Sequence, residues 1–108
     1  MCNKLLPRGE ERVMSVIWSS NEELSLPEIN RRVNDRFGTK LKPQTVSTFL
    51  TRLRARGYIS MYRKGRSFNY TVLIGKEDYL RMLMSDICDL WFNRNVDAMI
   101  DKTKEYCK

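Results

Sequence analysis

Apolar side chains recur at helical spacing in three stretches of the first half of the chain, at residues 9–18, 26–37 and 43–56. This spacing gives a helix one apolar side, which can pack on a core, and one polar side. Glu10 and Glu11 would lie in the first turn of the first helix, where acidic groups interact favourably with the helix dipole. The pattern therefore predicts three amphipathic helices. The residues expected on their apolar sides are Val13, Met14, Val16, Ile17 and Trp18, then Leu26, Ile29, Val33 and Phe37, and then Val46, Phe49, Leu50 and Leu53.

The residues that flank these stretches favour the same boundaries. Ser25 and Glu28 have the spacing of a capping box, so a second helix is expected to begin directly after Ser25 and to stop at Gly38. Pro43 suits the first turn of the third helix, and Gly57 suits the position just past its end. A short polar turn is thus expected between the second helix and the third.

Two strands are predicted after the third helix, at residues 58–62 and 67–73, because both segments are rich in β-branched and aromatic side chains. In the second strand Phe68, Tyr70 and Val72 alternate with polar neighbours, as in a strand with one buried face. The residues between the strands, Arg63, Lys64, Gly65 and Arg66, are expected to form the turn of a hairpin. Cations at such a tip can protect a strand edge, or they can contact phosphates or the minor groove of DNA. Their position directly after a basic polar helix favours DNA.

The polar side of the third helix has the composition of a helix that reads DNA. It carries Gln44, Thr45, Ser47, Thr48, Thr51, Arg52 and Arg54. Such side chains bind base edges in the major groove when they lie near the N-terminus of a helix. Taken alone, the segment is also compatible with an ordinary amphipathic surface helix.

Positive charge is concentrated around this helix. Residues 40–66 contain eight cations and no Asp or Glu. The net charge of the 108-residue chain is +7: residues 1–74 hold fourteen Lys or Arg against six Asp or Glu, giving +8, and residues 75–108 hold six against seven, giving −1. A clustered basic surface is typical of a protein that binds a polyanion. The change of charge predicts a DNA-binding domain at 1–74, followed by a segment at 75–108 with another role.

The segment after residue 75 carries more apolar surface than a small domain of three helices and a hairpin can cover. Its stripe comprises Leu80, Leu83, Met84, Ile87, Cys88 and Trp91 and continues, after a break at 93–95, through Val96, Met99, Ile100, Thr103 and Tyr106. Exposed stripes of this extent usually mark an interface, so we expect a homodimer. The residues expected in the interface are Leu80, Leu83, Met84, Ile87, Trp91 and Met99. The alternative is that the segment folds back on its own domain.

Other classes of protein are disfavoured. With no His, no phosphate-binding loop and no glycine-rich dinucleotide motif, the chain is not expected to be an enzyme, although a nucleophilic Cys88 stays open. Cys2, Cys88 and Cys107 are odd in number and scattered, which disfavours a disulfide framework or a metal site, and no cofactor is expected. The chain has no stretch long enough for a membrane helix and no signal peptide, which predicts a cytoplasmic protein.

Four segments together resemble the penicillinase and methicillin-resistance repressor family. They are VMSVIW at 13–18, LSLPEI at 24–29, KPQTVSTFLTRLRARGYI at 42–59 and KGRSFNYTVLI at 64–74. The most specific part is the pattern T-V-x-T-x-L-x-R-L-x-x-x-G-Y-I, which begins at Thr45. This family consists of dimeric bacterial repressors that bind palindromic operators through the third helix and a β-hairpin, called the wing.

The resemblance implies a mainly α fold with a small antiparallel β-hairpin, namely a winged helix-turn-helix followed by a C-terminal helical dimerisation segment. It implies a transcriptional repressor that binds double-stranded DNA. Together with the charge pattern it assigns DNA contacts to Lys42, Gln44, Thr45, Ser47, Thr48, Arg52, Arg63, Lys64 and Arg66. The alternative function is a winged helix used for contact with another protein.

Some family features do not carry over. Relatives commonly have a basic residue at the position of Ser47 and often Lys at that of Gln44, so their operator sequences do not transfer. The penicillinase branch is cleaved at an Asn-Phe bond after a sensor protease acts, whereas this chain has Phe92-Asn93 and no Asn-Phe. The copper-responsive branch has a cysteine cluster near its C-terminus, where this chain has only Cys107. The sequence leaves open the regulated genes, the inducing signal, any upstream sensor or protease, and the roles of Cys88 and Cys107.

Overall fold

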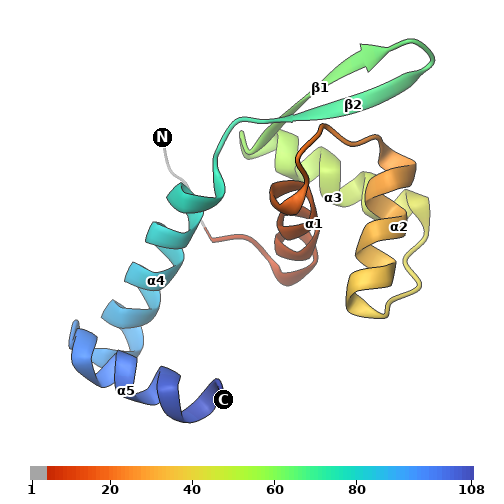
Figure 1. The fold of residues 1–108 in the computed structure, drawn as a ribbon. Helices are drawn as coiled ribbons and strands as arrows, with labels where there is room; N and C mark the ends of the chain where they lie inside the picture. The colour runs from red at the N-terminus through yellow and green to blue at the C-terminus, as the bar shows by residue number, and fades with distance from the viewer. Residues whose placement is uncertain (1–4) are drawn as a thin grey trace. The chain divides into compact units, whose positions relative to one another are not determined.

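A computed structural model of the chain describes residues 5–108, and that part contains five helices and one antiparallel hairpin (Figure 1). The elements are α1 (Arg8–Ser19), α2 (Leu26–Phe37), α3 (Pro43–Ala55), β1 (Ile59–Lys64), β2 (Ser67–Val72), α4 (Lys76–Phe92) and α5 (Val96–Tyr106). They divide into two units, with the boundary between Lys76 and Glu77. The predicted mainly α fold with a small hairpin is confirmed. In the part described, no helix is both long and apolar enough to span a membrane.

The core of the first unit is formed where α1, α2 and α3 pack on one another. Its most buried side chains are Val13, Met14, Ile29, Val33, Val46, Leu50 and Leu53 from the helices, Leu24 from the loop between α1 and α2, Tyr58 from the residues between α3 and β1, and Ile59 from the start of β1. Each large aliphatic side chain buried in this way contributes about 1.5–3 kcal/mol relative to an exposed one. Four residues predicted on the apolar sides are only half-buried, namely Trp18, Leu26, Phe37 and Phe49. The indole N–H of Trp18 donates a hydrogen bond to the carbonyl oxygen of Ile74 over 3.0 Å.

The ends of α2 follow the predicted signals. The backbone N–H of Ser25 donates to Oε1 of Glu28 over 3.0 Å, as in a capping box. The helix stops at Gly38, whose φ of 62° is left-handed and is adopted by glycine without the steric cost of a Cβ atom. The capping pair and the glycine therefore explain both boundaries. α1 begins at Arg8, one residue before the predicted start.

Asn34 organises the connection between α2 and α3. Its Nδ2 donates to the carbonyl oxygen of Leu41 over 3.0 Å, and its Oδ1 accepts from the Leu41 N–H and from the Thr39 hydroxyl, both over 2.8 Å. Asn30 donates to the same Leu41 carbonyl over 3.0 Å. Because these bonds fix the backbone just before α3, they set the direction in which α3 starts.

The hairpin differs from the prediction at its turn. Arg63 and Lys64 belong to β1, where they pair with residues of β2, so the predicted four-residue turn is wrong. The turn contains only Gly65 and Arg66. Gly65 has a φ of 64°, and a positive φ at the first of two turn residues is the pattern of a type II′ turn, whose twist matches that of paired strands. A tight turn is therefore favoured over a longer loop.

The core reaches only part of β2. Tyr70 is buried as predicted, but Phe68 and Val72, which were expected on the same buried face, are exposed. The backbone N–H of Tyr70 donates to the carbonyl oxygen of Leu24 over 3.2 Å. The hairpin is thus held to the loop between α1 and α2 at Tyr70, and its far end extends away from the three helices (Figure 1).

The second unit consists of α4 and α5. The predicted break between them is present: Asn93 and Arg94 have φ values of 49° and 65°, outside the helical range. Asn95 then caps α5, because its side-chain oxygen accepts a hydrogen bond from the Ala98 N–H over 3.0 Å. The break therefore ends α4 and allows a new helix to begin.

Candidate nucleic-acid interface

The polar side of α3 is open to solvent over its whole length. Lys42, Gln44, Thr45, Thr48, Thr51, Arg52 and Arg54 are exposed, and Ser47 is half-buried. On the other side of the helix Val46, Leu50 and Leu53 are fully buried and attach it to the core. The helix is therefore held rigidly while its hydrogen-bonding side chains face outward.

The start of α3 is electrostatically distinct. Among the helices of residues 5–108, α3 alone has no acidic residue in its first turn. Lys42 occupies the position before the first helical residue, and its side chain makes no capping hydrogen bond. Because the N-terminus of a helix carries a partial positive charge, such a start suits the approach of a phosphate.

Two threonine hydroxyls on α3 are engaged within the helix. Thr48 donates to the carbonyl oxygen of Gln44 and Thr51 donates to that of Ser47, each over 3.0 Å. Each hydroxyl hydrogen is therefore already used, which leaves the methyl group and the oxygen lone pairs for an external partner. A threonine in this state suits a thymine methyl or a hydrogen-bond donor on a base.

A groove of about 410 Å³ runs between α3 and the hairpin. Its lining comes from the start of α2, from α3 and from both strands: Leu26, Pro27, Ser47, Thr51, Arg54, Met61, Ser67, Phe68 and Tyr70. Of the predicted DNA contacts only Ser47 lies in it. Arg54 and Phe68 are additional candidates that the sequence did not single out, because helical periodicity places Arg54 on the polar side without showing that the hairpin faces it.

Three exposed cations lie at the end of the hairpin, namely Arg63, Lys64 and Arg66. The guanidinium of Arg63 lies 5.8 Å from the centre of the Phe68 ring, and its Nε donates to the carbonyl oxygen of Gly65 over 3.1 Å. Across residues 5–108 none of the three has a carboxylate within ion-pair distance. No direct ion pair therefore ties these cations to the described part of the protein.

A buried carboxylate on α1 holds the C-terminal end of α3. The Glu10 side chain is 1% exposed, and its Oε1 lies 2.9 Å from Nε of Arg56, the residue that follows α3. The two helices also approach closely nearby, since a Cβ atom on Gly9 would come within 2.6 Å of the Phe49 ring. Sequence reasoning assigned Glu10 only to the helix dipole. Its partner lies 46 residues away, so no local pattern reveals the pair.

Glu23, in the loop between α1 and α2, binds both strands of the hairpin. One carboxylate oxygen accepts a hydrogen bond from the Tyr62 hydroxyl, and the other accepts one from the Thr71 hydroxyl over 2.8 Å. These bonds, first that from Tyr62 and then that from Thr71, lower the pKa of Glu23 below its ordinary value. The same bond to Glu23 raises the pKa of Tyr62. Because Ser25 and Asn69 form a β-bridge beside it, this loop fixes the hairpin next to α3.

The predicted dimerisation residues lie on α4 and α5 with unequal exposure. Trp91 is 74% exposed and Met84 is 54% exposed, whereas Leu80, Leu83, Ile87 and Met99 are half-buried. Further exposed apolar side chains on these helices are Leu90, Val96, Ile100 and Tyr106. Of the cysteines, Cys88 is buried and Cys107 is exposed, and Cys2 lies outside the described residues. Dimerisation through these helices stays a prediction.

The penicillinase repressor family matches this chain over residues 7–107. The penicillinase repressor of Bacillus licheniformis is 26% identical over 92 residues, which cover 85% of this chain and 70% of that protein. An uncharacterised 16.5 kDa protein from the ptsI 3′ region of Latilactobacillus sakei is 29% identical over 102 residues, covering 88% of this chain and 66% of that protein. The similarity thus extends over both the first unit and the second.

Two solved structures share the fold. The solution structure of the DNA-binding domain of the repressor BlaI has a TM-score of 0.59 and 29% identity, and the match covers 72% of this chain and 94% of that one. The solution structure of monomeric Bacillus licheniformis BlaI in complex with the blaP half-operator has a TM-score of 0.58 and 28% identity, covering 72% and 92%. These similarities confirm the winged-helix architecture.

Proposed function

Because this chain belongs to the penicillinase repressor family, whose members are DNA-binding transcriptional repressors and not enzymes, we propose that it acts as a dimer on a palindromic operator. Each subunit places α3 in the major groove and the hairpin against the adjoining backbone. The proposal depends above all on one observation. α3 and the hairpin expose a basic surface, and residues 40–66 contain no Asp or Glu. The complex of monomeric BlaI with a half-operator supports one subunit per half-site.

Within this proposal the first turns of α3 read bases. Gln44, Thr45, Ser47 and Thr48 are the residues that meet base edges, because the N-terminal part of a recognition helix lies deepest in the major groove. Gln44 can pair with adenine in a bidentate manner, and the threonine methyl groups can meet those of thymine, which favours a half-site that contains A·T pairs.

The remaining cations contact the DNA backbone. Arg52 lies just over two helical turns beyond Gln44 and is assigned to a phosphate. Lys42 is assigned to the phosphate nearest the start of α3, and the hairpin cations to the flanking backbone. Arg54 borders the groove between α3 and the hairpin, so it is added to the phosphate contacts.

The second unit supplies the dimer contact in this proposal, which divides the chain into a DNA-binding domain at 1–74 and a dimerisation segment at 75–108. Support comes from its near-neutral charge and from its large exposed apolar side chains, Trp91 above all. Two-fold symmetry then requires a near-palindromic operator. The centres of its half-sites are separated by about 34–36 Å or a multiple of that distance.

Salt dependence tests the DNA-binding surface directly. The full chain is titrated with a labelled duplex of mixed sequence from about 50 mM to about 200 mM salt, and the wild type is compared with Arg63→Gln. We expect clear binding at low salt, and a slope of log K against log[salt] that is smaller by about one unit in the variant. Arg81→Gln is the matched control, because Arg81 lies on α4 and pairs with Asp78 over 3.3 Å. No affinity for duplex at low salt would instead indicate the alternative, a winged helix that contacts another protein.

A further inference from the structure

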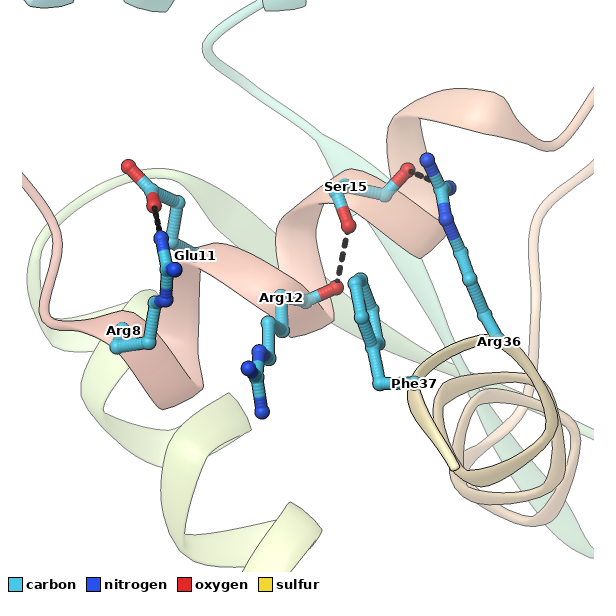
Figure 2. Close-up of a pocket in the computed structure, with 6 residues that line it drawn as sticks. All are labelled: Arg8, Glu11, Arg12, Ser15, Arg36 and Phe37. Atoms are coloured by element: carbon cyan, nitrogen blue, oxygen red, sulfur yellow. Dashed lines mark hydrogen bonds and ion pairs between the residues drawn. The ribbon is translucent and has the colours of Figure 1, made fainter. Parts of the chain in front are cut away.

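A second basic site, the α1–α2 pocket, lies between α1 and α2 (Figure 2). It is open to solvent, has a volume of about 380 Å³ and is lined by Arg8, Glu11, Arg12, Ser15, Arg36 and Phe37. None of these residues lines the groove beside α3. With three arginines and one glutamate, the lining carries a formal charge of +2.

The arginines of residues 5–108 fall into two groups by their ion pairs. Six have a carboxylate partner, namely Arg8, Arg31, Arg32, Arg56, Arg81 and Arg94. Six others in this part of the chain have none, and four of these, Arg52, Arg54, Arg63 and Arg66, lie on α3 and the hairpin. The remaining two are Arg12 and Arg36, both in the α1–α2 pocket. Unpaired arginines thus occur where the proposed DNA contacts are and in this pocket.

Both of these arginines lie beside Phe37. The guanidinium carbons of Arg12 and Arg36 lie 5.1 Å and 5.5 Å from the centre of its ring, and Figure 2 shows the ring between the two side chains. A cation–π contact with a ring face leaves N–H groups of the guanidinium available for hydrogen bonds. Arg36 uses one of them in a long contact of 3.5 Å to the carbonyl oxygen of Ser15. Both guanidinium groups therefore lie around one ring, with N–H groups available to a ligand.

We propose that the α1–α2 pocket binds a small anion that carries a phosphate or two carboxylates. Guanidinium forks match both groups in bidentate fashion. Glu11 would oppose an anion, but its charge is offset by Arg8, whose Nη1 lies 3.8 Å from Oε1 of Glu11 (Figure 2). The volume lies within the range of small-molecule sites.

The pocket is lined partly by α1, the helix that is linked to the end of α3 through the Glu10–Arg56 pair. Arg12 lies on α1, and the same helix carries Glu10, the buried partner of Arg56 at the end of α3. An anion held by Arg12 and Arg36 connects α1 with α2. It leaves the surface of α3 and the hairpin uncovered, since the two sites share no lining residue.

Amide chemical shifts of the ¹⁵N-labelled full chain test the proposal without DNA. Inorganic phosphate and succinate are added in separate titrations, in which each replaces chloride at constant ionic strength. Comparison of the two titrations shows whether the pocket binds a phosphate or a dicarboxylate. We expect saturable shifts on α1 and the C-terminal end of α2 in at least one arm, with a Kd on the order of 1 mM or tighter. Shifts that remain linear at every residue, or that are confined to α3 and the hairpin, would overturn the proposal.

Variants locate the site. Arg12→Gln and Arg36→Gln should each weaken binding at least about tenfold, because each removes charge-assisted hydrogen bonds. Arg31→Gln, which alters an exposed arginine of α2 paired with Asp35, should leave the Kd unchanged. Arg36→Lys keeps the charge but not the fork and should give an intermediate loss, which provides a second test should a glutamine variant unfold. If duplex DNA shifted the amide signals of the pocket residues and phosphate competed with it, the pocket would be part of the DNA contact. That result would contradict a site for a small molecule.

Discussion

Gln44 and Thr48 are one helical turn apart on the exposed side of α3, and the Thr48 hydroxyl donates to the Gln44 carbonyl. If this part of α3 reads bases, Gln44→Ala or Thr48→Ala should cost about 1–3 kcal/mol on the preferred duplex and almost nothing on unrelated duplex. Fluorescence anisotropy with both duplexes measures the difference. Arg52→Gln is the control for a backbone contact and should weaken both complexes alike. Equal losses for Gln44→Ala on the two duplexes would show that α3 positions the protein without specifying sequence.

The Glu10–Arg56 pair should matter more for stability than any other ion pair described within residues 5–108, because Glu10 is 1% exposed. Arg56→Ala leaves a buried carboxylate without its cation and should lower the free energy of unfolding by roughly 3 kcal/mol. That value is the low end for a broken buried pair, since the Arg56 side chain is 36% exposed. Arg31→Ala breaks an exposed pair and should cost less than about 1 kcal/mol. Urea unfolding checks both, and similar losses would contradict the special role of Glu10.

Individual polar residues were the hardest part of the site to predict. The exposure of Gln44 and Thr48 follows from helical periodicity, because their positions oppose Val46 and Leu50. The role of Glu10 depends on a partner 46 residues away, and that of Glu23 on Thr71, 48 residues away. Such contacts exist only after the helices and the hairpin have packed, so no local pattern in the sequence encodes them.

The Glu23 carboxylate attaches the hairpin to the loop between α1 and α2, so we expect this attachment to weaken in acid. Folding lowers the pKa of Glu23, so ionised Glu23 stabilises the folded protein. This contribution is fully present at a pH above the ordinary pKa of a glutamate, and it is lost as the pH falls through the lower pKa that Glu23 has in the folded protein. Tyr62→Phe removes the hydrogen bond that contributes most to this shift, so stability should fall less steeply with acidification in the variant. Chemical unfolding across the acid range measures the slope. Tyr106→Phe, an exposed position on α5, should match the wild type, and an unchanged slope in Tyr62→Phe would contradict this anchoring role.

Helices were more predictable than the hairpin turn, for a physical reason. The boundaries of α2 and α3 are set by capping residues and by proline and glycine, whose effects are local. The turn depends on strand register, and a two-residue turn at Gly65 and Arg66 allows Arg63 and Lys64 to complete their pairing with β2. The sequence therefore indicated the hairpin and its three cations but placed two of them in the wrong part of it.

At the scale of the whole molecule, the exposed apolar face of α4 and α5 should hold two subunits together. Trp91→Glu puts a charge at a position that is 74% exposed, so the isolated subunit should still fold while the dimer weakens by roughly 2 kcal/mol or more. Sedimentation equilibrium measures the loss, and affinity for operator DNA should fall with it. Asp86→Lys also changes charge at an exposed position of α4 and should remain dimeric. Wild-type monomers at micromolar concentration would remove the basis for the dimer.

Selection of bound fragments from a pool of random duplexes tests the central claim most directly, because it requires both sequence reading by α3 and two-fold assembly. The account predicts enrichment of an inverted repeat that contains A·T pairs, with half-site centres about 34–36 Å apart or a multiple of that distance. The same selection with Trp91→Glu should recover single half-sites or nothing. Enrichment of no common sequence by the wild-type protein, or of a single unrepeated site, would contradict a dimeric repressor that reads a palindromic operator.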